Sequence, residues 1–140
     1  MGARESIAGR LDCRFAGNRA VSDAANAARN FAVELGLARS NVSRLCVIIE
    51  ELVANLYEHG GLTGSDAIDL SLSSTPEGIK IILSDPGQPF DPRTAAPSKP
   101  RPARRGGAGI NIVCAWTRFV DYVVQPGQNR LELLMPIRRN

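Results

Sequence analysis

The sequence predicts a two-layer α+β sandwich, in which a mixed, mostly antiparallel sheet of about five strands is covered on one face by three helices. Short stretches that suit strands are joined by tight turns, and strands joined in this way pair antiparallel. Three other stretches have helical character, with apolar residues recurring at three- and four-residue steps. The apolar stripes of these helices need a surface to cover, and one face of the sheet provides it.

The chain begins with a predicted strand and a predicted helix. Residues 10–15 alternate well enough for a short strand. From 19 to 35, apolar residues recur on one side of a helical projection, which predicts an amphipathic helix closed by Gly36.

A second helix is expected from about Ser40, which suits the N-cap, to about His59, where the glycine pair at 60–61 stops it. Its apolar stripe leaves Glu51 and Asn55 on the opposite side, at about 100° of rotation per residue. The C-terminal half of this helix therefore turns a carboxylate and an amide toward something wet or polar.

The second half of the chain predicts two hairpins. Residues 67–73 and 78–83 read as strands, and residues 75–78 form the turn between them. The last hairpin is expected from strands at 120–124 and 130–135.

A proline-rich segment separates these hairpins. Residues 86–102 hold six of the nine prolines, so this segment forms neither a helix nor a central strand. A loop of this length inside a compact domain is typical of a lid, a binding loop or a disordered segment. It ends in a glycine motif at 106–109, and a helix is expected from Ile110 to about Phe119.

Composition restricts the class of protein. The chain has 140 residues, 44% hydrophobic and 22% charged, which suits one globular domain spanning 1–140. No apolar run is long enough to span a membrane, and the N-terminus lacks a secretory signal, so we expect a cytoplasmic protein. Its three cysteines are widely spaced and it has a single histidine. This argues against a disulfide framework, a zinc site and a multi-histidine metal site.

Positive charge is concentrated in one stretch. The net charge is +3, yet residues 92–120 carry six basic side chains and no acidic one. This asymmetry suggests a local anionic partner. Nucleic acid is a weak candidate, because the only aromatic residues of the stretch, Trp116 and Phe119, lie in an expected packed helix.

The first of three chemical motifs is Glu51, Asn55 and His59 at four-residue spacing, which places them along one side of a helix. The carboxylate could act as a general base, and the amide oxygen suits Mg²⁺. Taken alone, the same spacing is more typical of solvated positions on an amphipathic helix.

The other two motifs flank the proline-rich segment. Asp85 at a strand end could accept a hydrogen bond from an exocyclic amine such as that of adenine, and Gly87 would let a flat ring approach the backbone. The glycines at 106–109 open a helix, where free N–H groups bind phosphate, and Arg104 and Arg105 precede them. An ordinary turn and a flexible loop end are the alternative interpretations.

Taken together, the three motifs resemble the ATP-binding Bergerat fold, or GHKL superfamily, shared by gyrase, histidine kinases and MutL. Within it, the small anti-sigma-factor serine/threonine kinases are the most similar. The matching stretches are ELVANLYEHGG, DPGQPFDP and GGAGINIVCAW, and the likeness extends from about Arg10 to Ile137.

The resemblance implies a role for each matching residue. Glu51 would be the general base, and Asn55 would hold Mg²⁺. Asp85 would read the adenine amine, with Gly87 beneath the ring. The other implied ATP contacts are His59, Arg104, Arg105, Gly106, Gly107, Gly109 and Ile110. A cap or packing role suits His59 equally well, a solvated basic loop is the alternative for the two arginines, and Asn129 in the final turn is assigned a structural role.

The implied function is an ATP- and Mg²⁺-dependent protein serine/threonine kinase with an ATP lid at about 92–105. It would phosphorylate a small anti-sigma-factor antagonist and bind a sigma factor, which makes it a partner-switching regulator of transcription. The resemblance also suggests a homodimer, and it implies no direct contact with nucleic acid or membrane. The alternative is a catalytically inactive ATP-binding module that sequesters a regulatory protein.

Overall fold

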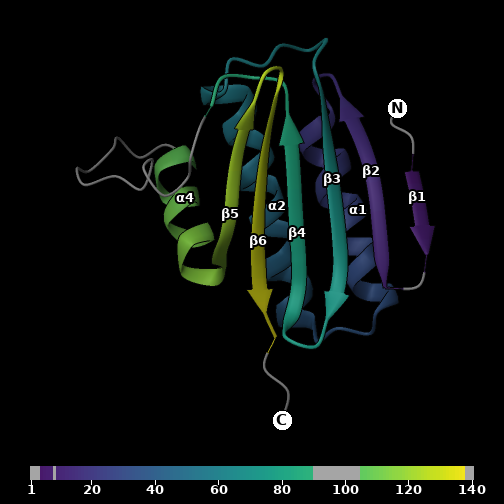
Figure 1. Ribbon diagram of the computed structural model, residues 1–140. Helices are drawn as coiled ribbons and strands as arrows, with labels where there is room; N and C mark the ends of the chain where they lie inside the picture. The colour runs from purple at the N-terminus through teal and green to yellow at the C-terminus, as the bar shows by residue number, and fades with distance from the viewer. Residues whose placement is uncertain (1–3, 8, 90–104, 138–140) are drawn as a thin grey trace.

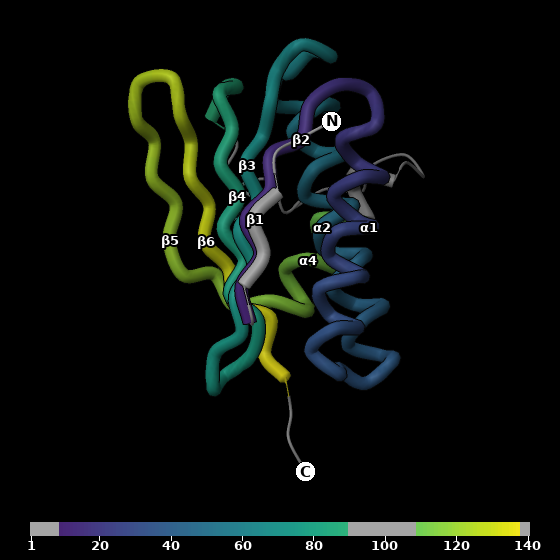
Figure 2. Tube along the Cα trace, turned by 90° about the vertical axis from the view of Figure 1, so that its right-hand side faces the viewer, coloured from purple at the N-terminus to yellow at the C-terminus, as the bar shows by residue number. Residues whose placement is uncertain are grey.

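The computed structural model describes residues 4–7, 9–89 and 105–137, and within them the α+β sandwich is confirmed. Figure 1 shows the sheet in front of the helices, and Figure 2 shows the two layers from the side. In chain order the elements are β1 (Arg4–Ile7), β2 (Arg10–Ala16), α1 (Ala20–Glu34), α2 (Arg39–His59), β3 (Ala67–Thr75), β4 (Gly78–Asp85), α4 (Arg105–Trp116), β5 (Arg118–Gln125) and β6 (Gln128–Pro136).

The strands of the described residues form one six-stranded sheet in the order β1-β2-β3-β4-β6-β5, which has one strand more than the sequence suggested. The additional strand is the four-residue β1, which pairs with β2 at the edge of the sheet, where Arg4 lies opposite Cys13. Each described pairing is antiparallel, so the sheet is not mixed in this part of the chain. The sequence did not predict β1, because four residues are too few for the alternation of a strand to be recognised.

Two helix starts differ from expectation. The N-cap of α2 is Ala38 rather than Ser40, and it forms no side-chain cap hydrogen bond. Helix α4 begins at Arg105 rather than Ile110, so the glycine motif forms its first turns. Glycine disfavours helix by about 1 kcal/mol relative to alanine, but packing of α4 on α2 overrides this local preference.

The core lies between the helices and the sheet. On β4, Ile79, Ile81 and Leu83 face the helical layer, as alternate residues of a strand must. On α2, Leu45 and Ile49 are fully buried against them. Burying each such side chain stabilises the fold by about 1.5–3 kcal/mol, so the sheet and α2 form a firm frame for residues at their ends.

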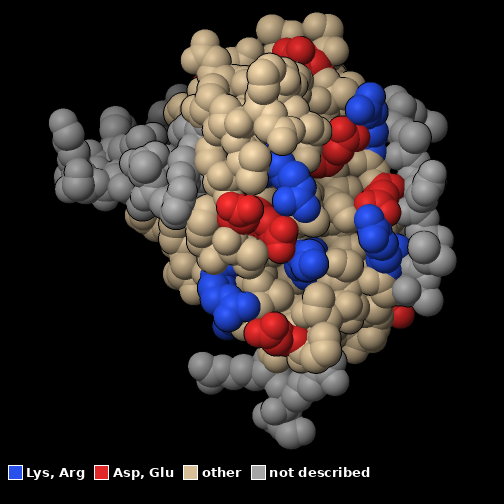
Figure 3. All heavy atoms as spheres, in the orientation of Figure 1, with Lys and Arg blue, Asp and Glu red and all other residues tan. Residues whose placement is uncertain are grey.

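The opposite face of the sheet carries interspersed positive and negative side chains, as Figure 3 shows. These side chains are exposed, so water and salt screen their charge pairs and the pairs add little to stability. No described helix is long and apolar enough to cross a membrane. The charge pairs on or beside this face are Arg10–Asp12, Arg14–Asp69, Arg118–Glu77 and Arg130–Glu132.

Candidate functional site

Two neighbouring strands bring a carboxylate and a carboxamide together at one end of the sheet. Asp85 is the last residue of β4 and continues the face formed by Ile81 and Leu83. The register of β4 with β6 places Asn129 directly opposite Asp85. Both side chains are buried, with 7% and 3% exposure, and both face the helices.

A hydrogen-bond network occupies one oxygen of Asp85. Its Oδ2 accepts from the Gly87 N–H at 2.8 Å and from Asn129 Nδ2 at 3.3 Å. Asn129 Nδ2 also donates to the Gly87 carbonyl oxygen at 2.8 Å. Both of these hydrogen bonds go to Oδ2, and the carboxylate lines the small cavity described below, so Oδ1 is the oxygen to which a ligand could donate.

Burial raises the pKa of Asp85, and the hydrogen bonds from Gly87 and Asn129 oppose part of that rise. The charged form is disfavoured by desolvation because few water molecules reach the site. A donor from a ligand would offset this cost, since a hydrogen bond to the charged form lowers the pKa.

The loop after β4 is packed against the end of α2. A Cβ on Gly87 would overlap the carbonyl oxygen of Gly60 and would lie 2.8 Å from Leu62 Cδ2. The Gln88 N–H donates to the same Gly60 oxygen at 2.8 Å. Packing of this loop against Gly60 and Leu62 therefore requires glycine at position 87. The sequence alone had suggested the approach of a flat ring as the reason for the same glycine.

Glu51 and Asn55 lie one turn apart on α2 with only 5% and 2% exposure. The sequence predicted wet or polar surroundings for this side of the helix, and of these two, exposure to water is wrong for Glu51 and Asn55, because α4 packs on α2. The side-chain oxygen and nitrogen of Asn55 have no hydrogen-bond partner among the described residues. An unpaired buried polar group costs about 1–3 kcal/mol, which a ligand would recover.

Gly109 allows the close approach of α4 to Glu51. A Cβ at this position would overlap the Glu51 carboxylate. Because α4 begins at Arg105, Gly109 lies in the second turn, where its N–H belongs to the helix's own hydrogen bonds. The amides of Gly106 and Gly107 lie in the first turn and are the ones that a helix leaves available for an anion.

A small cavity of about 20 Å³ joins these elements. It brings together three residues that the sequence singled out, Asn55, Asp85 and Ile110. Its volume suits about one water molecule, so a purine enters only if the walls move apart. Its complete lining is Leu52, Asn55, Leu56, Leu83, Asp85, Ile110, Tyr122 and Leu131.

Two polar side chains near the cavity were not predicted as site residues. Tyr122 was not singled out from the sequence, and Asn129 was assigned only a structural role. Tyr122 lies opposite Leu131 in the β5–β6 register, and Leu131 faces the core. Alternation within the last hairpin could have indicated this inward position. The pairing of Asn129 with Asp85 joins segments 44 residues apart and had no local signal.

Other predicted residues lie away from the cavity or outside the described residues. His59 is exposed at the end of α2, with Nε2 3.9 Å from Glu58 Oε2. Arg104 and the expected lid up to that residue lie outside the described residues. Arg105 is the first residue of α4, but its side chain is not described.

The donor set suits a hard cation with few protein ligands. The described residues contain no group of three His, Cys, Asp or Glu side chains that could hold a metal ion. Mg²⁺ keeps most of its water molecules and needs only one or two protein oxygens, so the unpaired Asn55 carboxamide fits it.

Comparison with known protein families identifies one domain family over most of the chain. A family model described as the histidine kinase-like ATPase domain matches residues 16–135. A search of curated proteins found no match. The matched range includes Glu51, Asn55, Asp85 and Asn129, together with the start of α4.

Proposed function

Since the chain belongs to the histidine kinase-like ATPase domain family, which implies ATP binding, we propose that it is an ATP-dependent protein serine/threonine kinase. Its substrate would be a small anti-sigma-factor antagonist, and it would also bind a sigma factor. The resemblance to anti-sigma-factor kinases, carried by the three sequence motifs, supports this narrower assignment.

The observation that carries the proposal is a buried, unpaired carboxamide next to a buried carboxylate on one cavity. Asn55 lacks a hydrogen-bond partner among the described residues, and Asp85, which accepts from Gly87 and Asn129 through Oδ2, lines the same cavity. An adenine amine is a donor that suits Asp85 Oδ1, and the Asn55 oxygen suits Mg²⁺ on the phosphates. When bound, Mg²⁺ would neutralise charge on the phosphate oxygens.

Glu51 would supply a general base, which phosphoryl transfer needs and a pure binding module does not need. Its carboxylate would accept the proton of the acceptor hydroxyl. The hydroxyl oxygen then bonds to the γ-phosphorus of ATP as the bond to the β–γ bridging oxygen breaks, and ADP leaves. The first-turn amides of α4, at Gly106 and Gly107, would stabilise the phosphate charge.

Access to Glu51 requires movement of α4. The carboxylate is 5% exposed and lies against Gly109, and the adjoining cavity is only about 20 Å³. Binding of nucleotide and acceptor would therefore be accompanied by displacement of the start of α4 from α2. The same burial of Glu51 favours the second candidate, an ATP-loaded module that sequesters a partner without phosphorylating it.

Phosphoryl transfer to the purified antagonist distinguishes the two candidates. The kinase assignment predicts that Glu51→Gln lowers kcat by a factor of about 10²–10⁴ and leaves ATP affinity nearly unchanged. Glu50→Gln is the matched control, because Glu50 is exposed and points about 100° away around the helix. Equal rates for wild type and Glu51→Gln would refute the catalytic role of Glu51, and ATP binding without transfer by wild type would establish the sequestering module.

A further inference from the structure

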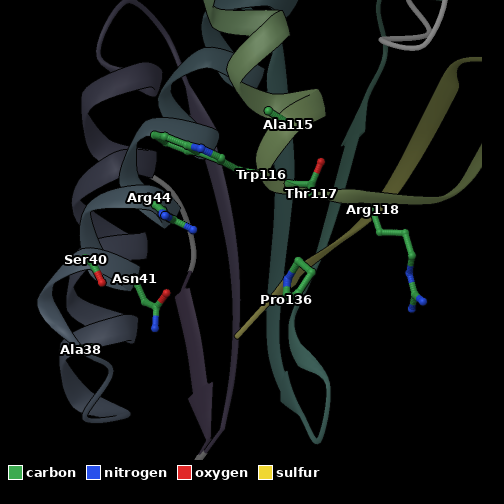
Figure 4. Close-up of a pocket in the computed structure, with 9 residues that line it drawn as sticks. All are labelled: Ala38, Ser40, Asn41, Arg44, Ala115, Trp116, Thr117, Arg118 and Pro136. Carbon is green, nitrogen blue, oxygen red and sulfur yellow. The ribbon is translucent and has the colours of Figure 1, made fainter. Parts of the chain in front are cut away.

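A polar groove lies at the opposite end of α2 from the candidate nucleotide site (Figure 4). Its volume is about 510 Å³, within the range of ligand-binding clefts. Arg44, on its wall, precedes Asn55 by about 16 Å along the helix, at about 1.5 Å per residue. The Arg44 groove, as we call it, is lined by Ala38, Ser40, Asn41, Arg44, Ala115, Trp116, Thr117, Arg118 and Pro136.

The described residues that line the groove carry positive charge and no negative charge. Its lining includes two arginines and neither aspartate nor glutamate. Arg44 is exposed, and among the described residues it forms no ion pair. Arg118, at the far rim in Figure 4, has one long, exposed contact of 3.4 Å with Glu77. Such a pair contributes little, so Arg118 can exchange it for a ligand carboxylate.

Trp116 holds the Arg44 guanidinium in place. The guanidinium carbon lies 5.4 Å from the centre of the indole ring, a cation–π distance. Figure 4 shows the indole extending from the end of α4 toward Arg44 on α2. A guanidinium positioned in this way loses less freedom when it binds a planar carboxylate through two hydrogen bonds.

Short polar side chains complete the wall. Ser40 and Asn41 line the groove one turn before Arg44 and add hydrogen-bonding groups. The adjacent start of α2 has no side-chain cap, so the positive end of the helix dipole adds to the field of the arginines.

We propose that the Arg44 groove binds an acidic peptide segment of a partner protein, with carboxylates at Arg44 and Arg118. The charge of the lining selects the sign of the occupant, and the groove is wider than a single inorganic anion needs. The chain's own C-terminal residues, Arg138 and Arg139, have the same sign as the groove and are poorly suited to fill it. This binding site is independent of the proposed kinase activity.

The only tryptophan of the chain lines the groove, so its fluorescence reports on occupancy. The probe is a synthetic peptide in which glutamate alternates with serine, and its reference has glutamine in place of every glutamate. We expect saturable binding of the acidic peptide to the full chain, read from Trp116 emission and from anisotropy of a labelled peptide. Binding should weaken between about 0.05 and 0.5 M salt because charge interactions are screened.

Arg44→Gln should raise the Kd of the acidic peptide about tenfold, and Arg44→Lys should raise it less. Replacing Arg44 also changes the surroundings of Trp116 and therefore its emission. The affinities of these variants are therefore compared by the anisotropy of the labelled peptide. Arg29→Gln is the matched control, since Arg29 is an exposed arginine on α1 that does not line the groove.

Any one of five outcomes would overturn the proposal. The first is that the glutamine peptide binds as tightly as the acidic peptide. The second is that Arg44→Gln binds the acidic peptide as tightly as wild type. Inorganic phosphate at peptide concentration would displace the labelled peptide, which indicates a site for small anions. Deletion of residues 138–140, or dilution of the protein alone, would change Trp116 emission, which indicates that the tail or a second copy fills the groove.

Discussion

Asn129→Ala removes the side chain that connects the loop after β4 to β6. Its Nδ2 donates to the Gly87 carbonyl oxygen at 2.8 Å and to Asp85 Oδ2 at 3.3 Å. The shorter bond is worth about 1 kcal/mol, and the Gly87 oxygen loses its partner in a partly buried site. The longer bond stabilises a carboxylate whose pKa burial already raises. We expect a loss of about 2–3 kcal/mol in the free energy of unfolding.

The same variant should weaken ATP binding. Asn129 positions Asp85, so its loss leaves the carboxylate less well oriented to accept from the adenine amine. We expect calorimetry with Mg-ATP to show an increase in Kd of about tenfold, the equivalent of one hydrogen bond to a charged group. Urea unfolding at neutral pH gives the stability change on the same protein.

Two further variants isolate the physical cause. Asn129→Asp places a second carboxylate beside Asp85, so repulsion between them raises the pKa of the pair in the folded state. This variant should be less stable than Asn129→Ala at neutral pH and should recover as the pH falls, because protonation removes the repulsion. Asn30→Ala, at an exposed position on α1, should change stability by less than about 0.5 kcal/mol. If Asn129→Ala matches Asn30→Ala in both stability and ATP affinity, the positioning role is refuted.

Two other changes test the same region. Gly109→Ala should destabilise the fold by about 1–2 kcal/mol in urea despite the better helix propensity of alanine, because its Cβ must displace the Glu51 carboxylate. Gly64→Ala, with no atom within 4 Å of the added Cβ, is its control, and a stabilised Gly109→Ala protein would contradict the contact. Asp85→Asn should change the pH dependence of unfolding. The raised pKa of Asp85 means that the folded state holds its proton at higher pH than the unfolded state. Wild type should therefore lose stability relative to Asp85→Asn as the pH rises from about 3.9 through the folded pKa, and the opposite slope would contradict the pKa direction.

Local patterns were sufficient to predict most of the frame. The stripe that includes Leu45 and Ile49 predicted α2, and the turn at 75–78 predicted the pairing of β3 with β4. Helical spacing singled out Asn55, and a position at the end of a strand singled out Asp85, and both line one cavity in the structure. These features depend on residues a few positions apart, so the periodicity of a helix or the geometry of a tight turn encodes them directly.

The amino-acid sequence by itself determined the helical stripes, the hairpins and the polar residues at their ends. Only the tertiary structure decided that α4 covers Glu51 and that Asn129 lies beside Asp85. It also decided that Arg44 meets Trp116 at a groove away from the proposed nucleotide site. Each of these contacts joins segments distant in the chain, and no local periodicity carries information about which distant surfaces will pack together.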